Sequence, residues 1–358
     1  TSESAFHLLV EAHRKPLPKL QYTYFQRSFE KPHRIPQFYC TPKVHKKPHW
    51  KTRPIVSCVN SRLGDLSKWV DVQLQRVMRL CPGYLKDSQS LVRTLRQLGK
   101  LPPTAVLVTA DAVSMYTNID TTHGLQTLRN WFHLHAHELP MEFPTEMVLK
   151  ATELIMRNNV FQLDDTFWLQ LTGSAMGTSL ACIFATIYYS YHEETAILPK
   201  YAHRTLPKLT LMPAPQMPVP RSNLNLTLMP APQMPVPRSN LTLMPAPQML
   251  VPWSVQPPLL LHARLIDDAF QIWYMARLPP GTSLLGFTGQ LQNEMKFGIL
   301  EWEAETPTRE VNFLDLTIRI EPDGSITTKT FVKPQNLFLY IPLRSAHPKG
   351  VLKSLIFG

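Results

Sequence analysis

The chain has 358 residues, which is longer than a single hydrophobic core usually supports, so two or three subdomains are expected. Lys and Arg number 37 against 26 Asp and Glu, and the resulting net charge of +11 favours a polyanionic partner, nucleic acid before an anionic membrane surface. A membrane-spanning protein is not expected, because no apolar run approaches roughly 18–20 residues. Four cysteines without metal-ligand spacing disfavour a zinc site or a disulfide framework.

The first fifty residues contain one predicted helix and one basic hairpin. Residues 1–36 are rich in His, Lys, Arg, Pro and aromatics, and only residues 4–13 have a helical pattern. Two short apolar strands then flank a loop, and the cations there are Lys43, Lys46, Lys47, Lys51 and Arg53. Cations on a hairpin can clamp a triphosphate or a nucleic-acid backbone, with Arg able to bind bidentately. A solvated basic loop is the open alternative.

A buried strand ending in an acid follows two helices. Apolar residues at three- and four-residue steps predict helices within residues 66–98, separated near residues 81–83. The continuous apolar run 105–110 predicts a central strand buried on both faces, and it ends at Asp111. A turn or cap role for Asp111 is the alternative. Asp120 or Thr121 is the better cap for the next helix, however, so Asp111 is left without a structural task.

Two Asp pairs share one local pattern. Asp267-Asp268 lies between apolar runs, which predicts a strand, a tight turn and a strand. Adjacent carboxylates near a core repel and are costly to desolvate, which favours a bound cation such as Mg²⁺. Asp164-Asp165 lies in a second strand-turn-strand pattern, so local pattern alone cannot separate a metal site from a solvated turn. A helix capped by Thr145 precedes that second pair.

Glycines follow the second Asp pair. Gly173 and Gly177, with small residues between them, let the backbone pass close to a ligand or to another backbone, and an apolar helix to about residue 195 comes next. Helix packing through the same glycine spacing is an equal alternative. Residues 205–258 contain 14 of the chain's 34 prolines in three imperfect repeats, and this composition predicts an extended insertion.

The last part of the chain is predicted to contain a helix and a hairpin. Residues 284–297 have a helical pattern, and alternation over 314–320 with 325–329 predicts a half-buried hairpin. Asp315 belongs to the polar face of this hairpin, and we assign it no catalytic role.

The order of these motifs resembles the palm of a reverse transcriptase, and their amino-acid sequences are most similar to those of Penelope-like element reverse transcriptases. The match covers roughly residues 37–350 apart from the proline-rich insertion. The segments that carry it are Thr41–Lys46, Arg53–Ser57, Tyr116–Ile119, Ala175–Thr178, Arg264–Asp268 and Asn312–Leu316.

The resemblance implies an α+β right-hand polymerase, with fingers and a palm whose antiparallel sheet packs on helices, and a partial thumb. Its expected parts are an N-terminal basic segment (1–36), fingers-like region (37–103), first palm part (104–204), insertion (205–258), second palm part (259–335) and truncated thumb (336–358). The implied activity is RNA-directed DNA polymerisation with an RNA template, a DNA primer and dNTP substrates. An intracellular, nuclear setting is expected, without a membrane and without a visible targeting signal.

The resemblance also implies roles for single residues. Asp111 and Asp267 would hold two Mg²⁺ ions, for which Mn²⁺ is a substitute, with Asp268 as the third carboxylate. Tyr116 would exclude a ribose 2′-hydroxyl. The residues implied to bind the nucleotide are Lys43 or Lys46 with Arg53 at the triphosphate, and Gln170 with Gly173 around the pocket. The family order leaves Asp164-Asp165 as a structural turn.

Two residues depart from the family pattern. Leu265 stands where an aromatic is usual before the Asp pair, and Cys182 stands where a proline is common. The insertion, the absence of the C-terminal nuclease of many relatives and the truncated thumb add to these. A catalytically inactive nucleic-acid-binding remnant is therefore the alternative function, and a non-retroviral polymerase with a similar palm is a further one.

Overall fold

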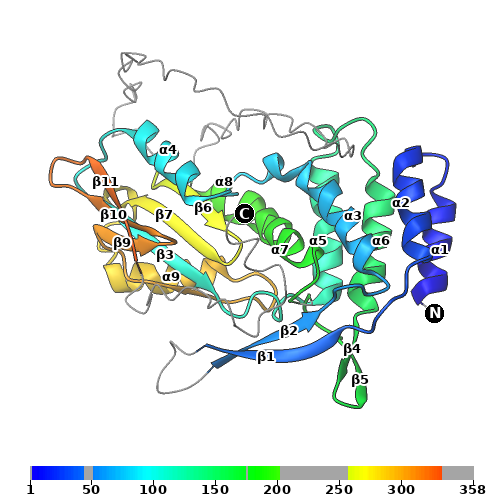
Figure 1. The fold of residues 1–358 in the computed structure, drawn as a ribbon. Coiled ribbons are helices and arrows are strands. Elements are labelled where there is room, and N and C mark those ends of the chain that lie inside the picture. The colour runs from blue at the N-terminus through cyan, green and yellow to red at the C-terminus, as the bar shows by residue number, and fades with distance from the viewer. Residues whose placement is uncertain (1, 44–50, 175, 202–256, 333–358) are drawn as a thin grey trace, which may run out of the picture.

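The structure is a computed structural model that describes residues 2–43, 51–174, 176–201 and 257–332. Lys46, nearly all of the predicted insertion and the predicted thumb at 336–358 lie outside these residues. Helices and strands are mixed, and the α+β fold class with antiparallel sheets packed on helices is confirmed (Figure 1). None of the described helices is long and apolar enough to cross a membrane.

Nine α-helices and eleven strands lie within the described residues. The helices are α1 Ser2–Ala12, α2 Lys19–Phe29, α3 Gly64–Gln75, α4 Ser88–Leu98, α5 Thr121–Leu134, α6 Thr145–Arg157, α7 Leu180–His192, α8 Leu198–Tyr201 and α9 Leu284–Met295. The strands are β1 Gln37–Lys43, β2 Lys51–Ser57, β3 Ala105–Ala112, β4 Val160–Leu163, β5 Thr166–Leu169, β6 Leu259–Leu265, β7 Asp268–Tyr274, β8 Trp302–Ala304, β9 Glu310–Phe313, β10 Leu316–Ile320 and β11 Ile326–Thr330.

A four-stranded antiparallel sheet in the order β6-β7-β3-β8 forms the centre of the molecule. The predicted strand 105–110 is confirmed as β3, which has a neighbour on each side, and the predicted hairpin around Asp267-Asp268 is confirmed as β6–β7. Side chains of β3 alternate between two cores. Val108 and Ala110 belong to the helical core with α5 and α7, whereas Leu107 belongs to the core shared with β9–β11.

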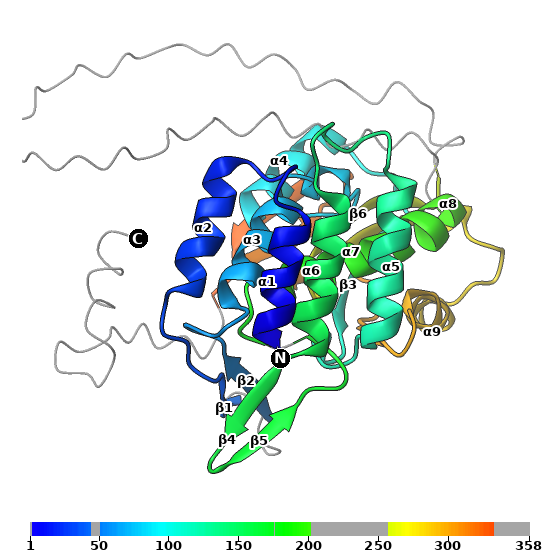
Figure 2. The ribbon, with the colours of Figure 1, turned by 90° about the vertical axis from the view of Figure 1, so that its right-hand side faces the viewer.

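The first hairpin and the second Asp-pair hairpin join into one separate sheet, in the order β2-β1-β4-β5. A single parallel pair, Gln37 with Gln162, connects the two hairpins, and their side-chain amides are 3.0 Å apart. The sheet projects from the helices at the lower edge of the molecule (Figures 1 and 2). Predicted fingers residues and residues 160–169, which were assigned to the palm, therefore share a sheet.

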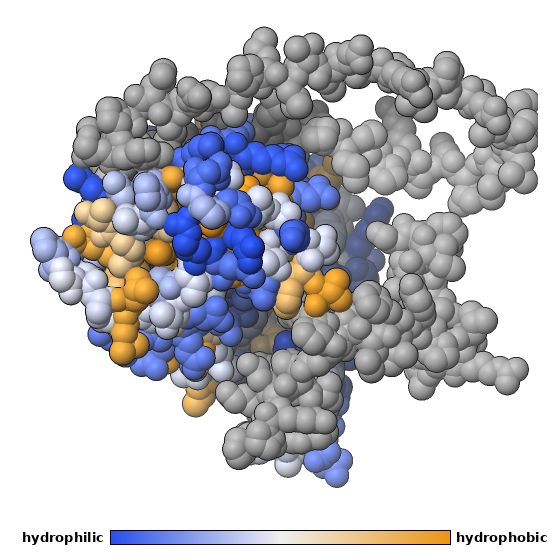
Figure 3. Space-filling model, turned by 90° about the vertical axis from the view of Figure 1, so that its left-hand side faces the viewer, coloured by the Kyte–Doolittle hydropathy of each residue, from blue (hydrophilic) through white to orange (hydrophobic). Residues whose placement is uncertain are grey.

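The C-terminal hairpin is confirmed as β10–β11 and is extended by β9 into a three-stranded antiparallel sheet. Ile318 and Ile320 are buried on its inner face, and the intervening Arg319 is exposed. The face of the molecule on this side has mostly hydrophilic surface with separate apolar spots (Figure 3). The alternation read in the sequence therefore reports one covered and one solvated face.

Helix α2 and strands β8 and β9 were not predicted, and the Thr145 cap is wrong. Prolines before α2 made the segment look irregular, but Pro18 stands at the N-cap, where a missing N–H costs nothing, and Phe25 anchors the helix in the core.

Pro144, not Thr145, occupies the N-cap of α6, and no side-chain hydrogen bond caps that helix. The predicted Asp120 cap of α5 is confirmed by a 2.7 Å hydrogen bond from the His123 amide.

Candidate active site

Strand pairing brings Asp111 and Asp268 opposite each other at one end of the central strands, with Asp267 in the adjoining turn, and we call this end of the sheet the acidic edge. Asp111 on β3 is directly opposite Asp268 on β7. Asp267 occupies the turn between β6 and β7, and its carbonyl oxygen accepts a hydrogen bond from the Ala112 amide at 2.9 Å. Directly opposite residues of an antiparallel pair project from the same face of a sheet, so the Asp111 and Asp268 side chains share one face. Long-range strand pairing thus joins Asp111 and Asp268, which are 157 positions apart in the chain.

Glu303 extends this acidic edge and was missed in the sequence. It lies on β8, directly opposite Asp111 on the strand's other side. The order across the sheet is therefore Asp268, Asp111, Glu303, three carboxylates on one face. The available signal was the alternation around Trp302, which is 3% exposed between exposed Glu301 and Glu303. A strand of three residues is too short for periodicity to identify it firmly.

The turn that carries Asp267 has an unusual backbone. Ile266 has φ of 56°, in the left-handed region, and it is the first residue of a two-residue turn between paired Leu265 and Asp268. A β-branched residue rarely adopts this conformation, at a cost of about 1–3 kcal/mol. Such a conformation persists only where the surroundings enforce it.

The buried side chain of Arg264 holds this turn in its conformation. Its Nη1 donates to the Ile266 carbonyl oxygen at 2.7 Å, and its Nη2 donates to the Thr186 carbonyl oxygen at 2.9 Å. Glu193, also fully buried, accepts from Arg264 Nε at 2.5 Å and from Nη2 at 3.0 Å. The guanidinium carbon lies 5.0 Å from the centre of the Tyr189 ring. The turn is thus tied to the helical layer by a buried, bidentate ion pair.

The ion pair continues into a chain of buried polar groups. His262 lies 2.7 Å from Glu193, and Gln271 bridges the other His262 nitrogen at 3.0 Å to the Trp273 indole at 2.7 Å. Burial alone would raise the pKa of the Glu193 carboxyl, but the charges of Arg264 and His262 hold that pKa well below its usual range. Glu193 begins a π-helical turn directly after α7, a local widening of a helix that is often found at functional sites.

The second Asp pair, Asp164-Asp165, is not supported by such a buried ion pair among the described residues. Asp164 has φ of 51° in the turn between β4 and β5, but Asp adopts the left-handed region readily, and both Asp164 and Asp165 are exposed. This turn belongs to the sheet β2-β1-β4-β5, away from the edge that holds Asp111. Tertiary structure therefore separates two pairs that the local pattern leaves equivalent.

Tyr116 lies close to the acidic edge. Its hydroxyl is 3.2 Å from the sulfur of Cys182 in the first turn of α7. Burial raises the pKa of the Tyr116 hydroxyl, and the Cys182 contact and the negative charge of Asp267 raise it further. The phenol is therefore neutral at physiological pH, beside the residue that departs from the family pattern.

The glycine segment packs directly on the Tyr116 turn. The Gly173 amide donates to the Ile119 carbonyl at 2.9 Å, and the Ser174 amide donates to the Tyr116 carbonyl at 2.7 Å. Gly173 has φ of 77°, and a Cβ there would lie 2.5 Å from the Tyr116 carbonyl oxygen. Gly173 is thus required by a close backbone approach.

The other predicted nucleotide-binding residues within the described ranges hold a loop or belong to the separate sheet β2-β1-β4-β5. The Gln170 side chain accepts from Asn159 at 2.6 Å and donates to the Thr172 carbonyl at 2.8 Å, so its amide holds the loop. Arg53 is exposed on β2, opposite Thr41 in the separate sheet. Lys43 ends β1, and Lys46 lies outside the described residues.

Comparisons with known proteins give distant structural likenesses. No protein-family model matches the chain, and no curated protein matches it. Apo telomerase from Candida tropicalis, truncated from the C-terminal domain, is similar at a TM-score of 0.46 and 10% identity, over 82% of this chain and 54% of that one. Telomerase from Candida albicans, in complex with a TWJ fragment of telomeric RNA, is similar at 0.47 and 12%, over 90% and 49%.

A viral enzyme shows a comparable likeness. The insertion-loop deletion mutant of the RNA-dependent RNA polymerase of a human picobirnavirus is similar at a TM-score of 0.45 and 10% identity, over 86% of this chain and 51% of that one. The chain spans about half the length of each of these structures. The activity is therefore argued from the geometry of the site.

Removing one partner of the buried ion pair is expected to destabilise the protein strongly. Glu193→Ala leaves Arg264 buried and uncompensated, with an expected loss of about 3–5 kcal/mol in the free energy of unfolding. Glu153→Ala is the matched control, since Glu153 forms an exposed pair with Arg157 on α6 at 3.0 Å, worth about 0.3–0.5 kcal/mol. Urea denaturation measures both, and equal losses would contradict a structural role for the ion pair.

Gly173→Ala is expected to lower the free energy of unfolding by about 1–2 kcal/mol from the left-handed backbone alone, with the clash against Tyr116 adding to this. Gly289→Ala in α9 is the control, because its added Cβ meets nothing within 4 Å and Ala favours a helix by about 1 kcal/mol. Thermal unfolding of both variants tests this. Two variants that unfold at the same temperature would argue against the close approach.

Proposed function

We propose that this chain is a nucleic-acid polymerase, specifically an RNA-directed DNA polymerase that adds dNTPs to a primer 3′-hydroxyl. The observation that supports it best is the pairing of Asp111 with Asp268, which brings the acid at the end of β3 to the acidic turn of β6–β7. Like charges directly opposite in a sheet destabilise it, so their retention favours a function that needs negative charge there. The Penelope-like motifs of the sequence favour a retroelement origin.

The acidic edge suits Mg²⁺. Proteins bind this ion through one or two carboxylates together with substrate phosphates, and the ion keeps several waters. Asp111 and Asp268 supply two facing carboxylates, and Asp267 is fixed beside them through its backbone. Within the described ranges no group of three or more His, Cys, Asp or Glu side chains is arranged to hold a metal, so the phosphates of a substrate would complete the coordination. Two bound ions would supply charge stabilisation for phosphoryl transfer.

The protein's own groups would bind and orient the substrate. Tyr116 presents a neutral phenol within the electrostatic influence of Asp267, at the position that the resemblance gives to a sugar-excluding ring. The glycine segment holds the Tyr116 turn by backbone hydrogen bonds, so the main chain that carries the ring is fixed. The net charge of +11 suits the backbones of a template and a primer.

A catalytically inactive nucleic-acid-binding remnant is the second candidate. The observation in its favour is that the three predicted acids do not form a closed cluster among the described residues. The same basic charge would serve binding without catalysis. Primer extension on poly(rA) with oligo(dT), compared with binding of the same duplex, separates the two. Binding without extension would favour the remnant, and replacing the RNA template by DNA tests a polymerase of another class.

Loss of the acidic edge is expected to abolish Mg²⁺-dependent primer extension. Asp111→Ala or Asp267→Ala should lower the extension rate by at least about 100-fold, the scale of removing one preorganised electrostatic group. Asp164→Ala is the matched control, because Asp164 occupies a similar turn in the other sheet. Extension by the Asp111 variant at the rate of the control would exclude the assigned site.

The sugar selectivity of the site is expected to depend on the Tyr116 ring. Tyr116→Ala should increase incorporation of ribonucleotides relative to deoxynucleotides, because space opens beside the 2′ position, while Tyr116→Phe should retain the selectivity. Single-nucleotide extension with matched dNTP and rNTP measures the ratio for each variant. An unaltered ratio in the alanine variant would show that the ring is no barrier to ribose.

A further inference from the structure

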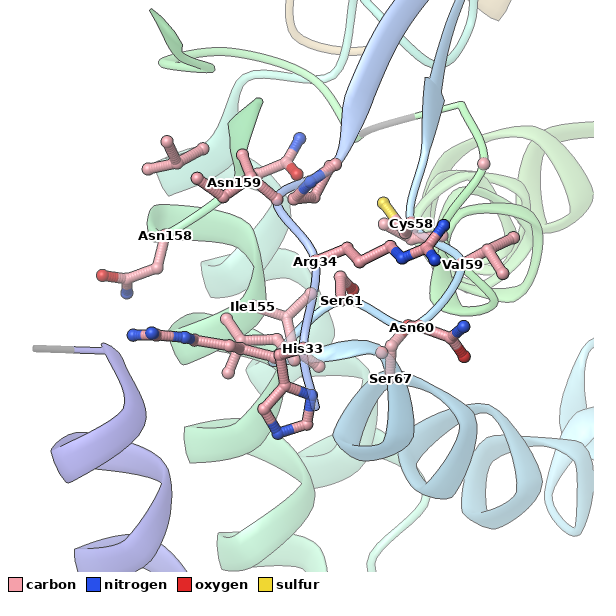
Figure 4. Close-up of a pocket in the computed structure, with 18 of the residues that line it drawn as sticks. His33, Arg34, Cys58, Val59, Asn60, Ser61, Ser67, Ile155, Asn158 and Asn159 are labelled. Atoms are coloured by element: carbon pink, nitrogen blue, oxygen red, sulfur yellow. The ribbon is translucent and has the colours of Figure 1, made fainter. Parts of the chain in front are cut away.

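A cavity in the helical layer is not used by the proposed active site. Its volume is about 620 Å³, and its walls come from the junction of α1 and α2, the end of α3 and the start of α6, helices that lie side by side in Figure 2. It is separate from a cavity of about 560 Å³ at the base of the projecting sheet, which Arg34 and Gly177 help to line (Figure 4). No residue of the acidic edge lines the first cavity, which we call the helical cavity, and its volume is within the range of preformed ligand sites.

The helical cavity has an apolar part that includes an aromatic ring. Its buried apolar residues are Leu17, Phe143 and Met147. Val72 on α3 also lines it and is 58% exposed, so apolar surface is open to solvent here. Three prolines are part of the lining as well, Pro16, Pro18 and Pro144. The fixed φ of proline stiffens these walls, and rigid apolar grooves with an aromatic ring are sites that bind proline-rich segments.

Two glutamines in the lining supply hydrogen-bond donors. The side-chain oxygen of Gln21 accepts from the Trp69 indole at 2.8 Å, and the side-chain oxygen of Gln73 accepts from Arg76 Nη1 at 2.7 Å. Each contact fixes the orientation of the amide and leaves its NH2 group as a donor. A polyproline II chain has no internal hydrogen bonds, so its carbonyl oxygens are matched by such donors.

Two glutamates in the lining have no partner of opposite charge. Glu142 and Glu146 are exposed, and neither carboxylate forms an ion pair or a hydrogen bond within the described part of the chain. The lining Arg76 instead donates to Gln73, and its guanidinium carbon lies 5.8 Å from the centre of the Phe143 ring. In a chain with a net charge of +11, two unpaired acids beside an apolar cavity favour a ligand segment that is cationic.

The repeats of this chain have a composition that matches the helical cavity. Residues 205–258 contain 14 prolines, three cations and no acid. The first two repeats contain Pro-Val-Pro-Arg, at Arg221 and at Arg238, whereas the third has Trp253 in place of the arginine. Proline-rich segments favour the extended polyproline II conformation. The two arginine repeats thus offer prolines to the apolar lining, carbonyl oxygens to the glutamines and a cation to the glutamates.

We propose that the helical cavity binds a Pro-Val-Pro-Arg repeat of the same chain, with the arginine facing Glu142 and Glu146. This inference is independent of the proposed polymerase activity. Arg221 follows Tyr201, the end of α8, by 20 residues, and an extended proline-rich segment of that length spans roughly 60 Å. A compact chain of this length has a radius of gyration of about 21 Å, so the repeat can reach the cavity. Docking there would hold the insertion on helices rather than on the strands that carry the acids.

Trypsin cleavage of the full chain tests this docking. Mass spectrometry follows the cuts after Arg221 and Arg238, and a free peptide of residues 209–223 gives the rate for an undocked repeat. One cavity holds one repeat at a time, so the first cut is expected at nearly the free-peptide rate. A tethered repeat has an effective concentration in the millimolar range, so a dissociation constant of about 0.1 mM would make the second cut about tenfold slower.

Exposed positions in the lining provide variants that leave the core intact. Val72→Arg fills the cavity, and Glu142→Lys combined with Glu146→Lys reverses its charge, so the second cut should rise to the rate of the first in both. Leu8→Arg in α1 and Glu153→Lys in α6 are the matched controls, because both residues are exposed and neither lines the cavity. The controls should keep the slow second cut.

Each result decides a separate part of the inference. Two cuts at equal rates in the wild type would overturn the docking, and a slow second cut in the cavity variants would overturn its assignment to this cavity. A second cut that slows only as the protein concentration rises would assign the contact to a second copy and overturn docking within one chain. Circular dichroism melting confirms that the compared proteins are folded. Primer extension is not part of the readout, so failure here leaves the polymerase proposal unaffected.

Discussion

The buried ion pair between Glu193 and Arg264 is the constraint on which the candidate active site depends. Both side chains are fully buried, so each charge is tolerable only because the other is present. The geometry that satisfies them also fixes the carbonyl of Ile266. The same guanidinium therefore supports the strained turn that carries Asp267. The pair joins the helical layer to the sheet at the point where chemistry is proposed.

Strand pairing supplies the second constraint. Asp111, Asp268 and Glu303 are brought side by side by hydrogen bonds between three strands, and the apolar residues of β3 and β7 are buried on both faces of the sheet. The cost of placing carboxylates opposite one another is therefore met by packing elsewhere on β3 and β7. Leu265, which stands where the resemblance leads us to expect an aromatic, packs against the core shared with β9–β11.

Two glycines, Gly173 and Gly177, bring separate segments of the chain into close backbone contact. Gly173 approaches the Tyr116 turn, and Gly177 approaches the end of β2. The Tyr116 turn and the end of β2 are both packed against these glycines, with little freedom for a side chain at either one.

The sequence by itself determined the main secondary structure and the order of the motifs. Strand β3, the hairpins β6–β7 and β10–β11, and helices α3 to α7 follow from apolar periodicity and turn residues, because these signals are local. Helix α2 was not predicted, because prolines mark a helix start as readily as a loop. Strands β8 and β9 were not predicted, because three or four residues contain too little periodicity. The acidic residues Asp111, Asp267 and Asp268 were identified from the sequence. Within the sequence, only the resemblance distinguished Asp267-Asp268 from Asp164-Asp165, and the tertiary structure then placed the two pairs in different sheets.

Tertiary structure alone decided which acids share an edge and what supports them. Glu303 joins Asp111 through a strand pairing almost 200 residues apart, and Glu193 reaches Arg264 across the interface of helix and sheet. A cavity lined by Arg34 and Gly177 is formed from five separate parts of the chain. No local pattern encodes such contacts, because they arise from burial of a whole core and from charges that must find partners once water is excluded.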